Sequence, residues 1–235
     1  MIDIHNHLLY GIDDGAKTIE ESIDVLKDLE RVGYTDIILT PHYIPDSGYS
    51  NPRSDNLVRL EKLKRELKNN NININLYLGN EIFMDDNIYR LLEEDVISSL
   101  NDTNYLLIEL PMSGEYAGYQ EIFKYLISKG YRVILAHPER YLSFQEDYNK
   151  VIELEEIGVY FQSNLDSIIG KYGPGAETMI KRLLKDNKIS FLATDIHRKK
   201  HDYRKWQEAR NIALEYVSRP VFKDLVYGNP SKLVR

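Results

Sequence analysis

The order of elements predicts an α/β protein whose seven parallel strands close, or nearly close, into a barrel. Short runs rich in β-branched and aromatic residues alternate with stretches of helical periodicity, which is typical of βα units around a parallel sheet. No repeat, linker or low-complexity segment divides the 235 residues. This length fits a single barrel domain over residues 1–235, one unit short of the common eight. A doubly wound open sheet is the alternative.

Seven segments are predicted to be strands, because each is a short apolar run bounded by turn-forming or helical sequence. In chain order they are Met1–His5, Thr35–Thr40, Ile74–Leu78, Tyr105–Leu110, Tyr131–Ala136, Val159–Gln162 and Ser190–Thr194.

Helices are predicted between these strands. Apolar residues recur at helical spacing over Ile19–Leu29, and Thr18-Ile-Glu-Glu21 resembles a capping box that opens this helix. Gly33 follows as a helix C-cap before the next strand, and Gly130 and Gly158 stand in the same position farther along. The remaining predicted helices are Ser54–Asn69, Tyr119–Ser128, Asp147–Glu156, Ala176–Asp186 and Tyr203–Val217.

The composition excludes several classes of protein. The chain has no cysteine, which rules out disulfides, zinc–thiolate sites and the cysteine nucleophile of many tyrosine phosphatases. Any nucleophile is therefore a hydroxyl, a carboxylate or an activated water. The formal charge of −7 disfavours a nucleic-acid partner. Neither a leader peptide nor an apolar run of membrane-spanning length is present, so we expect a soluble, cytoplasmic protein that is not itself in the membrane.

Residue types that bind metal ions stand at the carboxyl ends of six of the seven predicted strands. Barrel enzymes build their active sites at this end. Nitrogen and oxygen donors without sulfur suit Mn, Zn, Fe or Mg. In chain order these residues are His5, His7, His42, Glu81, Glu109, His137, Asp195 and His197.

Taken singly, most of these residues also have a simpler structural interpretation. His5 and His7 share one strand face, as two ligands of one ion would need, but such a pair is often incidental. A lone His42 or His137 is more often a satisfied core or surface histidine. Asp14, in an Asp-Asp-Gly loop, is typical of turn geometry.

Two observations favour the functional interpretation. Glu109 lies inside an apolar strand, where an ionised carboxylate is costly unless it is paired or binds a metal. Five of the six histidines of the chain also fall on strand ends or within two residues of them. The conjunction therefore predicts a metal site.

The ordered motifs resemble the polymerase-and-histidinol-phosphatase (PHP) superfamily, and within it the bacterial capsular-polysaccharide tyrosine phosphatases. The resemblance covers nearly the whole chain, and the ordered set is far more specific than any one motif. The matching motifs are Asp3-Ile-His-Asn-His-Leu-Leu-Tyr-Gly-Ile-Asp-Asp-Gly15, Thr40-Pro-His42, Gly79-Asn-Glu81, Ile108-Glu109, Ala136-His-Pro-Glu-Arg140, Thr194-Asp-Ile-His197 and Gly228-Asn-Pro-Ser-Lys-Leu233.

This resemblance implies the PHP fold, a distorted, TIM-like (β/α)₇ barrel, holding three divalent ions for which Mn is the expected metal and Fe, Zn or Mg are alternatives. It assigns the first ion to His5, His7, Glu81 and Asp195. It assigns the second ion to Glu81 as a bridge, with Glu109 and His137. It assigns the third ion to Asp14, His42 and His197.

A mechanism follows from that ligand set. Ions about 3.5–4 Å apart can clamp a phosphate and activate a hydroxide for direct in-line attack, with no phosphoenzyme. Arg140 directly follows a ligand strand, so we expect its guanidinium to meet the charge that develops on the phosphoryl oxygens. The simpler interpretation of Arg140 is a surface ion pair with Glu139.

The loop after the seventh strand departs from the family pattern, which usually carries a second arginine there. Arg198 or Lys200 are the substitutes that the sequence offers, although a basic run is often only a solvated face. We assign no ligand role to His201. Asp85-Asp86 is expected to cap a helix, and Asp166 receives no role.

The leading hypothesis is a phosphatase that acts on phosphotyrosine of a membrane-associated bacterial tyrosine autokinase controlling capsule and exopolysaccharide synthesis. A small-molecule phosphomonoesterase such as a histidinol phosphatase is the alternative enzyme, and a phosphodiester nuclease is disfavoured by the acidic chain. A non-catalytic, metal-binding docking barrel is the alternative outside enzymes. Tyr10, Tyr43 and Tyr49 are expected to line an open mouth for a phenyl phosphate.

Overall fold

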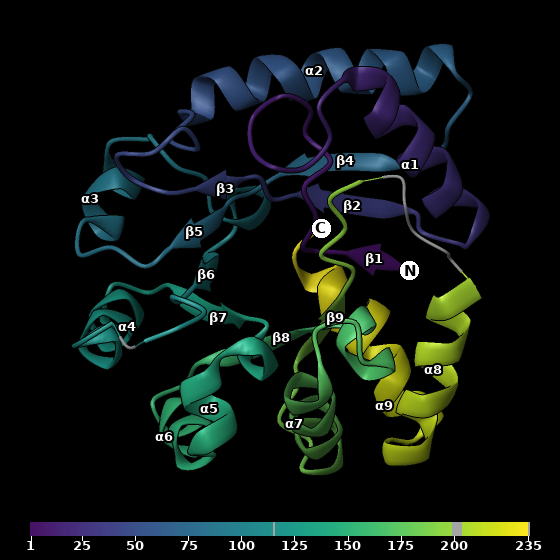
Figure 1. The fold of residues 1–235 in the computed structure, drawn as a ribbon. Helices are drawn as coiled ribbons and strands as arrows, with labels where there is room; N and C mark the ends of the chain where they lie inside the picture. The colour runs from purple at the N-terminus through teal and green to yellow at the C-terminus, as the bar shows by residue number, and fades with distance from the viewer. Residues whose placement is uncertain (115, 199–203, 235) are drawn as a thin grey trace.

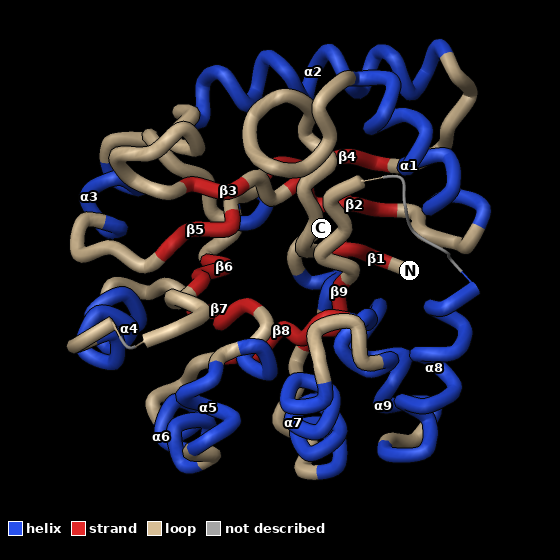
Figure 2. The backbone as a smooth tube through the Cα atoms, viewed as in Figure 1, coloured by secondary structure: helices blue, strands red, loops and turns tan. Residues whose placement is uncertain are grey.

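Parallel strands and helices alternate along the chain in the computed structural model, which describes residues 1–114, 116–198 and 204–234. The strands gather around the middle of the view in Figure 1, and the helices lie at the periphery. Figure 2 shows the same arrangement, with loops joining the strands to the helices outside them. The predicted α/β class with parallel sheets is therefore confirmed.

The strands form two hydrogen-bonded sheets in which every neighbouring pair is parallel. The first sheet has the order β1 (Ile2–Asp3), β2 (Asp36–Leu39) and β4 (Asn75–Leu78). The second has the order β3 (His42–Tyr43), β5 (Glu81–Phe83), β6 (Tyr105–Glu109), β7 (Arg132–Ala136), β8 (Tyr160–Asn164) and β9 (Phe191–Ala193).

All seven predicted strands are present, but β3 and β5 were not predicted as strands of their own. They are two and three residues long, which is too short for a periodic pattern to show. The chain leaves the first sheet after β2 and after β4, and enters the second at His42 and Glu81, which pair in register. The Asn80 side chain links the two crossings, because it donates to the Pro41 carbonyl and accepts from the Ser98 N–H. This split places two predicted ligands side by side.

The segment after β1 connects the two sheets. Asn6 forms an isolated parallel bridge with Ile196, which follows β9. On the other side, the Thr40 N–H donates to the Asn6 carbonyl at 3.0 Å. The Asp195 N–H donates to the His5 carbonyl at 2.9 Å. His5 and His7 are therefore held between the ends of β2 and β9.

The six predicted helices are present, with ends shifted by a few residues. The Thr18 hydroxyl accepts from the Glu21 N–H and caps α1 (Ile19–Arg31), as the capping box predicted. Gly33, Gly130 and Gly158 follow helices with φ of 97°, 91° and 94°, a conformation that favours glycine. The other predicted helices are α2 (Arg53–Asn69), α4 (Tyr119–Ser128), α6 (Asn149–Glu156), α7 (Pro174–Lys185) and α8 (Arg204–Tyr216).

Several short helical segments were not predicted, because they are too brief to show a period. Among them is α3 (Ile88–Glu93), which Asn87 precedes as N-cap; Asp85 accepts from the Asn87 N–H instead of capping the helix, so that expectation was wrong. The remaining segments are α5 (Leu142–Glu146), α9 (Arg219–Lys223), the 3₁₀ helices η1 (Leu100–Asp102), η2 (Pro138–Arg140), η3 (Leu165–Ile169) and η5 (Pro230–Lys232), and the π-helical η4 (Asp224–Gly228).

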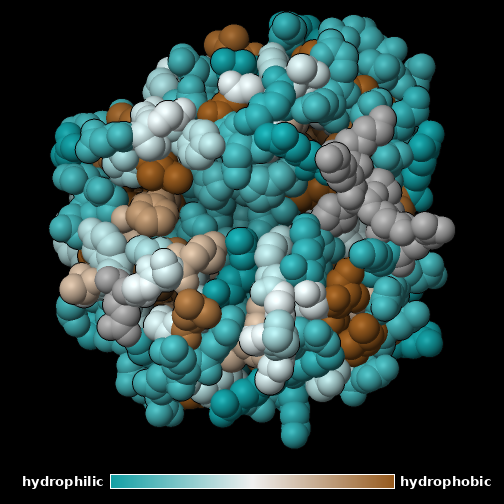
Figure 3. Space-filling view, in the orientation of Figure 1, coloured by the Kyte–Doolittle hydropathy of each residue, from teal (hydrophilic) through white to brown (hydrophobic). Residues whose placement is uncertain are grey.

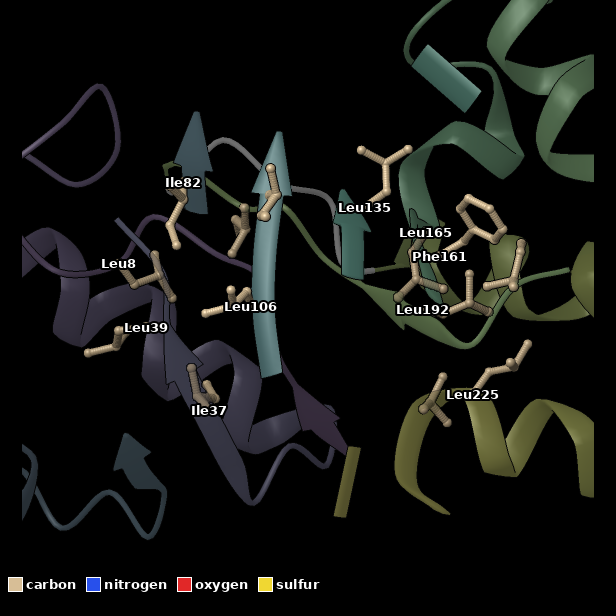
Figure 4. Close-up of a cluster of buried hydrophobic side chains, with 14 of the residues drawn as sticks. Leu8, Ile37, Leu39, Ile82, Leu106, Leu135, Phe161, Leu165, Leu192 and Leu225 are labelled. Carbon is tan, nitrogen blue, oxygen red and sulfur yellow. The ribbon is translucent and has the colours of Figure 1, made fainter. Parts of the chain in front are cut away.

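The strands are buried on both faces. Leu106, Leu135 and Leu192 point to the larger apolar cluster, between strands and helices (Figure 4). Their strand neighbours Leu107 and Ile134 belong to a second, smaller cluster. Alternate residues of a strand face opposite sides, so this division means that apolar packing supports the strand ends from both sides. No helix in the described ranges has the length and apolar character that crossing a bilayer requires.

Candidate metal centre

The structure brings all nine sequence-predicted ligands together at the carboxyl ends of the strands and the loops that follow them. Four overlapping groups of these residues each place their donor atoms within 4.8 Å of one another. These groups are His7, Asp14, His42 and His197; His5, His7 and Glu81; His5, His137 and Asp195; and His42, Glu81 and Glu109.

Glu81 occupies the middle of the cluster, and its two oxygens face four imidazoles. Its Oε1 lies 2.9 Å from His137 Nε2 and 3.2 Å from His5 Nε2. Its Oε2 lies 2.9 Å from His42 Nδ1 and 3.3 Å from His7 Nε2. A carboxylate in this position can bridge two cations, one through each oxygen.

Asp195 divides its two oxygens between the cluster and its support. Oδ1 lies 3.4 Å from His7 Nε2 and 3.5 Å from His197 Nδ1. Oδ2 accepts hydrogen bonds from Arg140 Nη1 at 3.0 Å and from Asn164 Nδ2 at 2.7 Å. One oxygen therefore remains directed at the imidazoles while the other is fixed by the protein.

The outer ligands Asp14 and Glu109 lie slightly farther from the imidazoles. Asp14 Oδ1 is 3.7 Å from His42 Nε2 and 3.6 Å from His197 Nε2. Glu109 is 3.7 Å from His42 Nδ1 through Oε2, and 3.8 Å from His137 Nε2 through Oε1. These separations exceed a hydrogen bond and leave room for an atom between the donors.

The backbone is strained at two of the predicted ligands. His137 has φ of 33° and Asp195 has φ of 50°, in the left-handed region that non-glycine residues seldom adopt. His137 directly follows β7, and Asp195 comes shortly after the end of β9. Strain of this kind persists where surrounding contacts enforce a functional geometry.

Two residues that we had not assigned to the site orient its histidines. Asp13 Oδ2 lies 2.8 Å from His7 Nδ1, and Gln162 Oε1 lies 2.7 Å from His5 Nδ1. With an oxygen acceptor at Nδ1, each ring carries a proton there, and its Nε2 faces Glu81 and Asp195 as the nitrogen available to an ion. Gln162 lies within β8 and was the last residue of Val159–Gln162, the one predicted strand without a ligand, so a polar residue at that predicted strand end was the available signal.

Several buried side-chain nitrogen and oxygen atoms in the cluster have no hydrogen-bond partner within the described part of the chain. They are His5 Nε2, His7 Nε2, His42 Nδ1, Glu81 Oε2 and His137 Nδ1; His42 Nδ1 and Glu81 Oε2, although 2.9 Å apart, form no hydrogen bond with each other. Buried polar atoms are rarely left unsatisfied, because each one costs free energy. Here most of them converge on the same centre, and all are imidazole nitrogen or carboxylate oxygen. The residues therefore fit divalent ions of the Mn, Fe, Zn or Mg type.

Without bound ions, the electrostatic environment inside the cluster shifts the pKa values of several of its ligand side chains. Burial opposes the charged form of His5, yet Glu81 and Asp195 raise the pKa of His5 to about 9. Burial, reinforced by the charge of Glu81, raises the pKa of Glu109 to about 8. Burial lowers the pKa of His137 to about 4. Before any ion binds, protons therefore neutralise part of the site, and a cation would replace them.

The cluster opens into a cavity of about 920 Å³, within the range of ligand-binding sites. Its lining includes the apolar side chains Met112, Ile169 and Tyr172 and the cations Arg140 and Lys205. The middle of the face shown in Figure 3 is mainly hydrophilic, as such a lining requires.

The tyrosines expected at the mouth occupy other positions. Tyr43 is buried on β3, and Tyr10 lies against Arg59, whose Cζ is 5.5 Å from its ring centroid. Tyr49 alone of the three stacks on a site residue, with its ring centroid 6.1 Å from that of His42. The tyrosine that lines the cavity is Tyr172, in the loop after η3, which sequence reasoning missed.

Arg140 lies at the cavity wall and pairs with Asp195, not with Glu139. Glu139 is buried and accepts from the Asn164 N–H and the Ser167 hydroxyl. The surface ion pair considered for Arg140 is therefore wrong. Arg198 also lines the cavity, and its Nε and Nη2 donate to the Asp14 carbonyl at 3.2 and 3.1 Å. Lys200 and His201 lie outside the described residues.

Comparison with known proteins gives relatives that cover 84% to 100% of the chain. The chain is 35% identical to CapC of Staphylococcus aureus, over 84% of this chain and 77% of CapC. It is 34% identical to the tyrosine-protein phosphatase YwqE of Bacillus subtilis, with the same coverage. It is 27% identical to the tyrosine-protein phosphatase CpsB of Streptococcus pneumoniae, over 100% of this chain and 98% of CpsB.

Solved structures agree with these relatives. A crystal structure from the study of Bacillus subtilis YwqE and Streptococcus pneumoniae CpsB, described as metal-dependent tyrosine phosphatases, matches with a TM-score of 0.92. It is 31% identical and covers 100% of this chain and 94% of its own. Histidinol phosphate phosphatase of Lactococcus lactis shares the fold, with a TM-score of 0.60, 16% identity, and coverage of 92% and 93%.

The family model for capsular polysaccharide synthesis, CpsB/CapC, matches residues 1–235. The match spans every motif on which the resemblance was based, from the opening His-Asn-His to the closing Gly-Asn-Pro. The chain therefore belongs to the CpsB/CapC family.

Proposed function

We propose that this chain is a metal-dependent phosphatase that hydrolyses phosphotyrosine in a protein substrate. One observation carries the proposal: nine ligand-type side chains, with Glu81 in their middle, converge at the base of an open cavity that has Arg140 on its wall. The relatives YwqE and CpsB, which are named tyrosine-protein phosphatases, support the same activity.

The ligand groups support three neighbouring ion positions, with Mn as the proposed metal. His5, His7, Glu81 and Asp195 would hold the first ion; Glu81, Glu109 and His137 the second; and Asp14, His42 and His197 the third. His7 also groups with the third set of ligands, His42 with Glu81 and Glu109, and His137 with His5 and Asp195, so the three positions adjoin. When bound, divalent ions supply positive charge that polarises phosphoryl oxygens and lowers the pKa of water.

Arg140 would bind the phosphoryl group of the substrate. Its guanidinium offers five N–H donors, enough to bind two phosphoryl oxygens, and in the described structure one of them, at Nη1, is directed at Asp195. Donors placed where charge develops are worth more in a partly desolvated cavity than in water. The charge on Arg140 would thus stabilise the transition state more than the ground state.

The cavity lining supports an aryl phosphate as substrate. Met112, Ile169 and Tyr172 provide apolar surface beside the ligand cluster, where a phenyl ring attached to the phosphate could lie. The phenol of a tyrosine leaving group has a pKa of about 10, so it departs more readily than a serine alkoxide. The open cavity would admit a side chain projecting from a peptide, which a small metabolite does not need.

We propose a membrane-associated tyrosine autokinase of capsule synthesis as the phosphoprotein, with the phosphatase acting in the cytoplasm. The description of the family as one of capsular polysaccharide synthesis supports this substrate. The chain lacks cysteine, so its activity would not depend on reducing conditions.

We propose that the two sheets form one distorted (β/α)₇ barrel in a single domain over residues 1–235. The bridge between Asn6 and Ile196 supports closure, because it joins the segment after the first strand to the segment after the last. The alternating apolar clusters on the two strand faces support it too, since barrel strands are buried inside and outside.

The test is a side-by-side assay of a phosphotyrosine peptide, a phosphoserine peptide and histidinol phosphate, each with defined Mn and with excess EDTA. We expect the highest kcat/KM for the phosphotyrosine peptide and loss of activity with EDTA. Faster hydrolysis of histidinol phosphate would refute the substrate assignment while leaving the metal chemistry intact. Bound metal without turnover of any of the three substrates would support the non-catalytic docking protein instead.

A further inference from the structure

Tyr172 contacts the catalytic candidate Arg140 directly. The Arg140 Cζ lies 4.4 Å from the centroid of the Tyr172 ring, within the range of a cation–π contact. The Tyr172 hydroxyl is 3.5 Å from Asp195 Oδ2, which is longer than an ordinary O–H···O hydrogen bond. The ring, more than the hydroxyl, therefore makes the contact that matters.

The loop that carries Tyr172 is held to the neighbouring helix through Lys171 and Asp166. It runs between Gly170 and Gly173, whose φ angles of 77° and 92° are strained for any other residue. Its Lys171 Nζ donates to Asp166 Oδ2 at 2.8 Å. Asp166 is buried, and its Oδ1 accepts from Trp206 Nε1 at 3.2 Å. Asp166, to which we had assigned no role, thus anchors the loop to helix α8.

We propose that Tyr172 is a positioning residue for Arg140. Its ring keeps the guanidinium at the cavity wall while the guanidinium exchanges its contact with Asp195 for one with the phosphoryl group. This inference rests on the proposed function, in which Arg140 binds that group. The ion pair with Asp195 holds the guanidinium through Nη1. Once phosphoryl oxygens compete for those donors, the Tyr172 ring remains as a contact that does not use them.

Asp195 can release Arg140 without being left unsatisfied. Its Oδ2 also accepts from Asn164 Nδ2 at 2.7 Å. A flexible arginine loses rotamer freedom when it is ordered, and a preformed stack removes that cost from the reaction step. Tyr172 would therefore raise kcat more than it lowers KM.

The test is a double-mutant cycle between Tyr172 and Arg140, measured as kcat on a phosphotyrosine peptide at saturating Mn. Tyr172→Leu, and Tyr172→Met as a second ringless variant, should lower kcat about 3- to 30-fold. Tyr172→Phe keeps the ring and should stay within about 2-fold of wild type. In an Arg140→Ala background, the Tyr172→Leu change should alter kcat by less than about 2-fold.

Metal content and Tm of every variant separate positioning from a general structural effect. Tyr227→Leu, a surface tyrosine far along the chain in η4, is the matched control and should leave kcat unchanged. A full additional loss from Tyr172→Leu in the Arg140→Ala background would overturn the inference. So would wild-type kcat in both ringless variants while Arg140→Ala is impaired. If Arg140→Ala itself retains full activity, the phosphate role of Arg140 fails and this inference falls with it.

Discussion

Asp13 is expected to control metal affinity through His7, and Asp13→Asn is the informative change. Asp13 Oδ2 lies 2.8 Å from His7 Nδ1 and accepts from the His42 N–H at 3.0 Å, and Oδ1 accepts from the Gly15 N–H at 2.9 Å. Every contact of this carboxylate is with a donor. An asparagine in either orientation must place its NH₂ against at least one of these donors.

The magnitude follows from that geometry. One buried donor left without an acceptor costs about 1–3 kcal/mol, which for a chain of this size lowers Tm by about 2–12 °C. His7 would also lose the carboxylate that fixes its tautomer and raises its basicity, and partners of this kind are worth about 10- to 100-fold in metal affinity. We therefore expect the Mn concentration for half-maximal activity to rise about 10- to 100-fold.

The assay is a Mn titration of phosphotyrosine-peptide hydrolysis, with Tm measured separately in EDTA. Activity at saturating Mn should largely recover, because the residues assigned as ligands are all still present. Asp86→Asn is the control, since Asp86 is exposed and accepts only a Tyr116 hydroxyl in the described structure. A Mn dependence identical to wild type in Asp13→Asn would refute the argument that Asp13 sets the state of His7.

Four further outcomes are expected. Protein purified without chelator should carry close to three divalent ions per chain and be reactivated best by Mn; no bound ion, with full activity in EDTA, would contradict the metal centre. His137→Ala should lose an ion and nearly all turnover, whereas Arg140→Ala should keep its metals and lose about 10²- to 10³-fold in kcat. Glu109 and His5, with pKa values of about 8 and 9, are protonated at pH 7 before ions bind, so Mn binding should release protons and tighten as pH rises; calorimetry in buffers of different ionisation enthalpy checks this, and identical heats would refute it. Activity should not respond to thiol reductants or alkylating agents, because the chain has no cysteine.

Predictability of the fold depended on the length of each element. Strands β6 and β7 are five residues long and stand out in the sequence as apolar runs. Helix α1 is thirteen residues long, and both its helical period and its Thr18 cap are visible in the sequence. Strands β3 and β5 carry too few residues for a period, and each consists partly of a predicted ligand. Their strand character comes from pairing across the sheet, as between His42 and Glu81, which no local pattern contains.

The candidate site was predictable in its residue types but not in its partnerships. Glu109 was identifiable because an ionised carboxylate inside an apolar strand is costly unless it is paired or binds a metal. The histidines were identifiable because five of the six fall on predicted strand ends or within two residues of them. The residues that hydrogen-bond to the predicted ligands were not identifiable from the sequence. Gln162 is 157 positions from His5 along the chain, and Asn164 is 31 positions from Asp195.

The amino-acid sequence by itself determined the alternation of strands and helices, the absence of thiol chemistry and the set of nitrogen and oxygen donors at the strand ends. These are local properties, since they follow from side-chain chemistry and from the periods of helix and strand. The tertiary structure alone decided that Glu81 faces four imidazoles, that Asp13 and Gln162 orient two of them, and that Tyr172 stacks on Arg140. Those relations arise because parallel strands that pair side by side bring distant segments within bonding distance, and only the packing of the whole chain sets which side chains meet.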